Sequence, residues 1–141
     1  MYEKYTRQSL PPKEYRELLG TAICVFNSNN AFVIENILKN DDDDVYNWHE
    51  LIDLTSGELS SPIKETITKN SNTDITNLFS ELIELRNRIV HSFQITSEDE
   101  EQMLRTKNKK HIQYNITKEL LLDFICKNET LSTMLHKFRG Y

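Results

Sequence analysis

Three polar side chains within one six-residue segment, Arg86, Asn87 and His91, have types that could do chemistry. A histidine can transfer a proton near neutral pH, and a guanidinium can stabilise developing negative charge. If residues 74–93 form a helix, Asn87 and His91 lie one turn apart and share a polar face. Arg86 instead falls within the apolar stripe, where an unpaired guanidinium is disfavoured, so it needs a partner or a cleft.

The helix that must position these side chains is predicted from the apolar residues of segment 74–93. They recur at the three- and four-residue spacing of one helical face: Ile75, Leu78, Phe79, Leu82, Leu85, Ile89 and Phe93. On an ideal helix Arg86 and His91 point ~140° apart, so one chain does not bring both to a single ligand. In the structural alternative, Arg86 only extends its charge into solvent and His91 only ends a helix.

The composition predicts a single, mostly α domain. The chain has 141 residues, of which 28% are charged, with 3 Gly and 3 Pro, a balance that suits long helices with few turns. The formal net charge of −5 argues against a protein that coats nucleic acid generally, because such binding depends on excess cations. A local basic cleft remains compatible with that charge.

The chain is expected to be cytoplasmic and to contain no membrane span. It has no apolar run of 18 residues, and its first ten residues are too polar for a secretory signal. Cys24 and Cys126 lie in apolar, helix-patterned segments, which predicts buried thiols rather than a disulfide. Two Cys and four scattered His have no metal-ligand spacing, so we expect no metal and no cofactor.

The first half of the chain predicts one long helix and two short ones. Residues 1–11 read as an arm, and a helix begins near Pro12 and continues to about residue 39. Its apolar stripe comprises Leu19, Ile23, Phe26, Ile34 and Ile37. Asn30 interrupts this stripe, so its amide either bonds a neighbouring helix or lines the same pocket as Arg86.

The acidic run Asn40 to Asp44 lacks the glycine and distal glutamate of an EF-hand. It predicts a solvated loop with an Asp N-cap before Val45. Short helices should follow over 45–55, with Trp48 in the core, and over 62–69.

The last part of the chain predicts a β-hairpin over 102–116, followed by a helix from Thr117 to about Arg139 that Gly140 ends. The hairpin is rich in cations: Arg105, Lys107, Lys109 and Lys110. These cations could contact phosphate, or they could simply keep the tip of the hairpin solvated.

The sequence Arg86-Asn87-Arg88-Ile89-Val90-His91 resembles the Rx4H motif of the HEPN superfamily, including the polar residue that the family favours directly after the arginine. The motif stands near the end of a long helix, in a chain of suitable length. The resemblance implies a HEPN-like helical bundle of four to five helices, two long with shorter ones between. The hairpin would be an insertion before the C-terminal helix.

The resemblance also implies a metal-independent endoribonuclease that acts as a homodimer through the helix 74–93. Arg86, His91 and Asn87 would be the catalytic residues, with Arg88, Asn30 and Ser92 contacting RNA. Such a protein could be a toxin with an antitoxin partner or an effector of antiviral defence. In relatives controlled by a partner nucleotidyltransferase, a tyrosine two residues after the histidine often accepts AMP. Phe93 stands there, so that regulation is not expected.

Two alternatives follow from the same residues. The chain could be a noncatalytic helical module that binds a nucleotide or mediates protein assembly, which its acidic net charge favours. It could also be a structural subunit in which Arg86 is a satisfied core residue.

Overall fold

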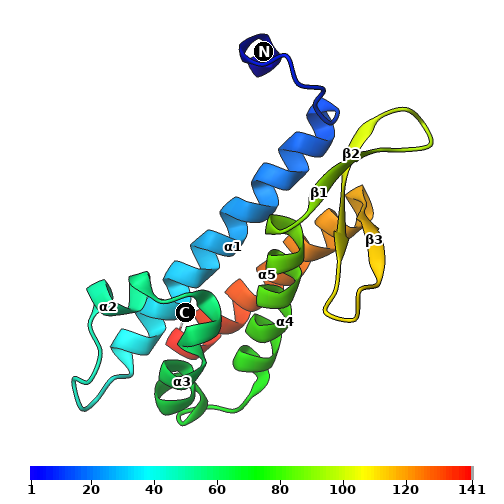
Figure 1. The fold of residues 1–141 in the computed structure, drawn as a ribbon. Helices are drawn as coiled ribbons and strands as arrows, with labels where there is room; N and C mark the ends of the chain where they lie inside the picture. Colours follow the sequence, from blue (N-terminus) through cyan, green and yellow to red (C-terminus); the bar gives the residue numbers. More distant parts are fainter. Residues whose placement is uncertain (141) are drawn as a thin grey trace.

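The computed structural model describes residues 1–140, which form a helical bundle with a small sheet at one side (Figure 1). The helices are α1 (Lys13–Lys39), α2 (Trp48–Asp53), α3 (Ser60–Ile63), α4 (Asp74–Val90) and α5 (Lys118–Arg139). The strands are β1 (Phe93–Thr96), β2 (Gln102–Lys107) and β3 (Gln113–Ile116). Single turns of other helix types span Tyr2–Tyr5, Ser56–Leu59 and Lys64–Thr68. The predicted mostly α bundle with a hairpin before the last helix is confirmed.

The two long helices α1 and α5 run parallel to each other. Lys118 and Glu14 pair at 2.8 Å near the two N-terminal ends, and Arg139 and Glu35 pair at 3.1 Å near the C-terminal ends. Between them the buried Asn29 donates its amide to the carbonyl and side-chain oxygens of Asn128, at 2.8 and 3.0 Å. These contacts fix the register of the two helices.

Three aromatic rings form the centre of the core. Phe26 of α1 stacks with Phe79 of α4 at 6.0 Å between ring centroids and with Phe124 of α5 at 6.2 Å. All three side chains are fully buried. Offset rings at this separation add favourable interaction to the burial of their surface. Phe26 thus joins α1, α4 and α5, and it lies directly under Arg86.

The sheet is a three-stranded antiparallel meander in the order β1-β2-β3. Its inner face packs on the helices, with Thr106 and Ile116 fully buried. The Tyr15 hydroxyl of α1 donates to the carbonyl of Ile116 at 2.5 Å and accepts from the N–H of Leu104 at 3.1 Å. Burial raises the pKa of this hydroxyl. One side chain therefore connects α1 to both strands of the hairpin.

The predicted helix 74–93 ends earlier than expected. Its last helical residue is Val90, His91 is the C-cap, and Phe93 lies in β1 with 42% of its surface exposed. The prediction that Phe93 belongs to the apolar helix face was wrong, because this residue pairs with Arg105 across the sheet. The predicted hairpin is present, with β1 added as a third strand.

The burial of three individual side chains was predicted wrongly. Trp48, expected in the core, is 49% exposed. It is the first residue of α2, which is capped by Asn47 and not by an Asp before Val45 as expected. Cys24 and Cys126 were expected to be buried, but both are exposed and free. They occupy the sides of α1 and α5 that face away from the rings of the core.

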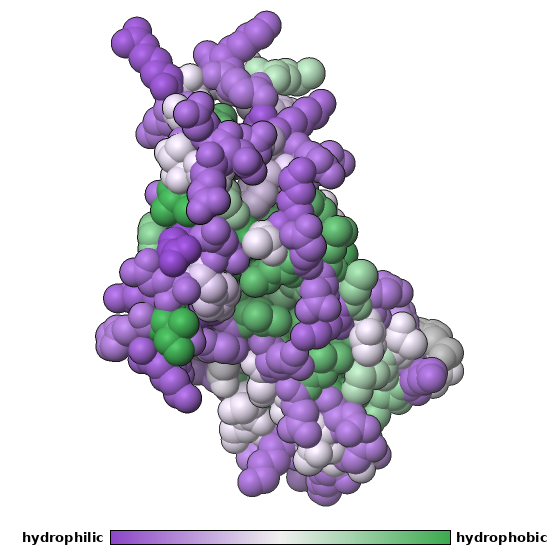
Figure 2. Space-filling view, turned by 90° about the vertical axis from the view of Figure 1, so that its right-hand side faces the viewer, coloured by the Kyte–Doolittle hydropathy of each residue, from purple (hydrophilic) through white to green (hydrophobic). Residues whose placement is uncertain are grey.

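No helix of the described part is long and apolar enough to cross a membrane. The side of the molecule on the right of Figure 1 is hydrophilic at its upper end, while apolar residues gather in its middle (Figure 2).

Candidate functional site

The site lies where α4 ends. The N–H of His91 bonds the carbonyl of Asn87 at 2.9 Å, which completes the last helical turn. His91 itself has φ −95° and ψ 25°, away from the helical values of about −63° and −42°. The ideal-helix separation of ~140° between Arg86 and His91 assumes helical dihedral angles throughout, and His91 departs from them.

Arg86, Asn87 and His91 border one open hollow of about 400 Å³. The remaining lining residues come from α4 and from the turn before α3: Thr55, Gly57, Ile83 and Val90. A single chain therefore brings the three predicted catalytic residues to one surface depression. Ser92, Arg88 and Asn30 are not among the residues that line it.

Arg86 is held in place by an aromatic ring and an amide rather than by an acid. Its Cζ lies 4.8 Å from the centroid of the Phe26 ring, and its Nε donates to Asn87 Oδ1 at 3.0 Å. Among residues 1–140 it has no carboxylate within ion-pair distance. Burial lowers the pKa of this guanidinium, since desolvation disfavours its charged form. A partly desolvated cation without an acid partner suits an anionic ligand.

Asn87 and His91 divide the remaining roles. The Asn87 oxygen is occupied by Arg86, so this residue positions the guanidinium rather than the histidine. The His91 side chain is exposed, and within the described part of the chain it makes no hydrogen bond or ion pair. No partner among residues 1–140 therefore competes with a ligand for this ring.

The opposite wall is fixed by a capping box. The Thr55 hydroxyl accepts from the N–H of Glu58 at 3.4 Å, and Glu58 Oε1 accepts from the N–H of Thr55 at 3.0 Å. Hydrogen bonding of the Glu58 carboxylate to the Thr55 backbone, and to a lesser extent to the Thr55 side chain, lowers the pKa of Glu58. This wall was not predicted from the sequence, although Thr55-x-x-Glu58 is the pattern of a capping box and could have indicated the turn.

The other three predicted site residues make contacts within the protein. Arg88 pairs with Glu84 at 3.3 Å and donates to the carbonyl of Lys107, which ties α4 to the hairpin. Ser92 Oγ donates to the carbonyl of Ile89 at 2.6 Å.

Asn30 bonds an adjacent element, one of the two roles expected for it. Its Oδ1 accepts from the Ser56 hydroxyl at 2.7 Å. Since Ser56 stands between two lining residues of the hollow, this bond supports the wall from behind.

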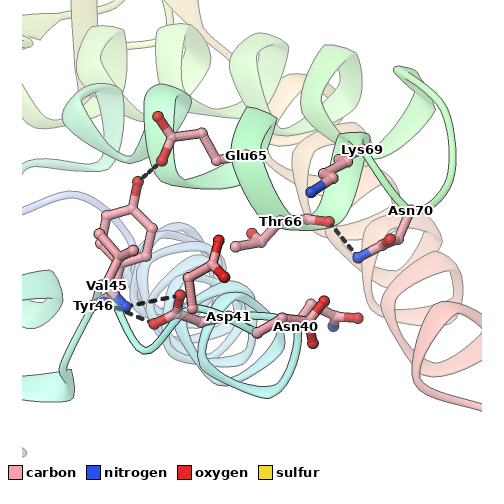
Figure 3. A pocket seen from close by; sticks show the side chains of 10 residues that line it. Asn40, Asp41, Val45, Tyr46, Glu65, Thr66, Lys69 and Asn70 are labelled. Atoms are coloured by element: carbon pink, nitrogen blue, oxygen red, sulfur yellow. Dashed lines mark hydrogen bonds between the residues drawn. The ribbon is translucent and has the colours of Figure 1, made fainter.

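The acidic run after α1 forms a second, smaller pocket of about 60 Å³ (Figure 3). There Asp41 accepts the N–H groups of Val45 at 3.0 Å and Tyr46 at 2.7 Å. The Tyr46 hydroxyl donates to Glu65, and this bond raises the Tyr46 pKa to about 12. Within residues 1–140 no cluster of three or more His, Cys, Asp or Glu side chains could hold a metal ion.

No protein-family model, no curated protein and no solved structure matches this chain.

Proposed function

We propose that the protein is a metal-independent endoribonuclease of HEPN type that acts as a homodimer in the cytoplasm. The observation that carries this proposal is the hollow itself, where an exposed histidine and an acid-free guanidinium stand on one surface. One group can transfer a proton and the other can bind a phosphodiester. Together they fit RNA cleavage by the neighbouring 2′-hydroxyl.

The reaction needs one attack and two proton transfers. The 2′-oxygen attacks the adjacent phosphorus, the bond from phosphorus to the 5′-oxygen breaks, and the products are a 2′,3′-cyclic phosphate and a 5′-hydroxyl. A neutral His91 accepts the 2′-hydroxyl proton, while Arg86 stabilises the charge on the phosphoryl oxygens. Asn87 keeps the guanidinium oriented through its bond to Nε.

A second copy of the chain supplies what one hollow lacks. The 5′-oxygen needs a proton donor, and each chain contributes one histidine to the hollow. A two-fold contact along α4 places a protonated His91 of the second chain against the leaving oxygen. The exposed Val90, beside His91 at the rim, offers apolar surface for such a contact.

The test is cleavage of labelled RNA in EDTA by the wild type and by His91→Ala. We expect activity that survives chelation, yields 2′,3′-cyclic phosphate ends and falls at least 100-fold in His91→Ala. His49→Ala, which changes another exposed histidine outside the hollow, is the matched control and should retain full activity. Equal rates for His91→Ala and the wild type would reject the proposal.

A second candidate function is a noncatalytic module that binds a nucleotide in the same hollow. The acidic net charge of −5 favours this alternative, because it opposes the binding of a long polyanion. Calorimetry with ATP, GTP and short RNAs separates the two. Binding that Arg86→Ala abolishes, without any cleavage by the wild type, would select the module.

We propose that such a ribonuclease acts in the cell either as a toxin restrained by an antitoxin or as an effector of antiviral defence. Growth arrest on expression, absent in His91→Ala, is the corresponding observation in cells.

A further inference from the structure

The outer face of the sheet carries an aromatic and cationic surface that begins two residues after His91. Directly paired residues of antiparallel strands point to the same side of a sheet. The register pairs Phe93 with Arg105 and Arg105 with Asn115, and it pairs Lys107 with Gln113. These five residues form two adjacent rows, which we call the outer rows. Their strand neighbours Thr106 and Ile116 point the other way and are buried.

Arg105, the cation that pairs with Phe93, is held by two neutral partners. Arg105 donates from Nε to Gln113 Oε1 at 3.0 Å and from Nη1 to Asn115 Oδ1 at 2.6 Å. Both acceptors are amides, so they orient the guanidinium without neutralising it. Arg105 and Lys107 have no carboxylate within 4.0 Å among residues 1–140. The oriented Arg105 and the exposed Lys107 therefore place two positive charges on this face, in a chain whose net charge is −5.

Charge along the sheet is also polarised. The turn between β2 and β3 adds Lys109 and Lys110, both exposed, to the end that carries Lys107. The turn between β1 and β2 holds the four acids of residues 98–101 at the opposite end. An anionic strand is therefore attracted to the basic end and repelled at the acidic end, which confines it to the outer rows.

Phe93 places an apolar ring in this cationic surface. It is an exposed aromatic residue at the start of β1, only two residues after His91. Figure 1 shows β1 continuing directly from the end of α4, with the sheet at the side of the bundle. A ring beside a guanidinium is the combination that takes a stacked base and its phosphate.

We propose that the outer rows bind single-stranded RNA, with a base stacked on Phe93 and the flanking phosphates on Arg105 and Lys107. The choice of RNA as the occupant rests on the proposed function. Same-face neighbours along β2 are about 7 Å apart, so the two cations can meet successive phosphates of an extended strand. The outer rows thus guide the strand that enters or leaves the hollow.

The test measures binding in full-length His91→Ala protein, which leaves the RNA uncut. Fluorescence anisotropy with a 12-nucleotide single strand is recorded over a range of salt concentrations. Arg105→Gln and Lys107→Gln should each weaken binding and reduce the salt slope by about 0.7, the value for one lost contact to a single strand. Phe93→Leu keeps an apolar side chain in β1 and should weaken binding about 5- to 150-fold through lost stacking.

Two controls make the result specific. Lys39→Gln removes an exposed lysine at the end of α1 and should leave the affinity unchanged. An abasic strand of the same length should bind Phe93→Leu and its parent equally, because it has no base to stack. Unchanged affinity in the outer-row variants would overturn the proposal, and so would an equal loss in Lys39→Gln.

The two proposals fail in different ways. If RNA binding depends on the outer rows but the wild type does not cleave RNA, the ribonuclease proposal is rejected and the proposed binding surface is supported. If cleavage depends on His91 but the Phe93 and Arg105 variants bind RNA normally, the proposed binding surface is rejected and the ribonuclease proposal is supported. A dinucleotide substrate, too short to reach the outer rows, should be cut equally by the wild type and by Phe93→Leu.

Discussion

Replacing Arg86 with methionine separates a functional arginine from a structural one. Methionine keeps an unbranched apolar stem on the Phe26 ring and removes the charge and the hydrogen bond to Asn87. If Arg86 serves a ligand, the fold should tolerate this change while the activity does not. If it is a core residue, stability should fall with the activity.

The expected loss of stability is small because gains and losses oppose each other. The cation above Phe26 contributes about 0.5–1 kcal/mol, and its hydrogen bond to Asn87 about 1.5 kcal/mol at a half-exposed site. Removing a partly desolvated charge offsets part of this sum, as the direction of the Arg86 pKa shift indicates. We expect a net loss below about 2 kcal/mol, or roughly 8 °C in Tm for a chain of this size.

Thermal unfolding and RNA cleavage should be measured on the same preparations. Arg86→Met should reduce cleavage by about 10²–10³, the usual effect of removing one oxyanion donor. Phe26→Ala is the structural control, with an expected loss of about 3–5 kcal/mol, because it deletes a fully buried ring. A Tm for Arg86→Met as low as that of Phe26→Ala, or cleavage at the wild-type rate, would refute the assignment of Arg86 to a site.

Two further predictions concern stability and titration. Tyr15→Phe leaves the Leu104 N–H and the Ile116 carbonyl without their shared partner, so urea denaturation should show a loss of about 1–3 kcal/mol. Ultraviolet titration should place the Tyr46 midpoint at about pH 12, and in Glu65→Gln this midpoint should return toward 10. The pKa of Tyr46 is higher in the folded than in the unfolded protein. The stabilisation by its hydrogen bond to Glu65 is therefore complete below about pH 10 and is lost as the pH rises through about 12.

Both tyrosine predictions have a matched control in the exposed Tyr5. Tyr5→Phe should change neither the urea midpoint nor the titration of Tyr46. A Tyr15→Phe protein as stable as the wild type would show that water satisfies the two backbone groups. A Tyr46 midpoint that Glu65→Gln leaves at about 12 would assign the shift to a cause other than this hydrogen bond.

Local sequence patterns correctly predicted the helix ends that are marked by a capping residue, a glycine or a proline. Thr117 caps α5 through its hydroxyl, and Gly140 ends that helix in the left-handed conformation at φ 93°, both as expected. Pro12 stands directly before α1. The end of α4 was placed too late because Phe93 fits the helical spacing as well as it fits a strand. Only its pairing with Arg105, a contact distant in sequence, decides between them.

The residue types and their spacing were enough to identify the groups available for chemistry: a histidine, a guanidinium and an amide within six residues near the end of a helix. Helical periodicity also determined that Arg86 borders the core. The tertiary structure decided what each group faces, because that depends on residues far along the chain. The Phe26 ring contacts the guanidinium of Arg86, and the turn at Thr55 lines the hollow. Arg88 instead donates a hydrogen bond to the carbonyl of Lys107 in β2 and does not line the hollow. Burial and pairing of this kind depend on how the helices pack, and a local pattern does not encode them.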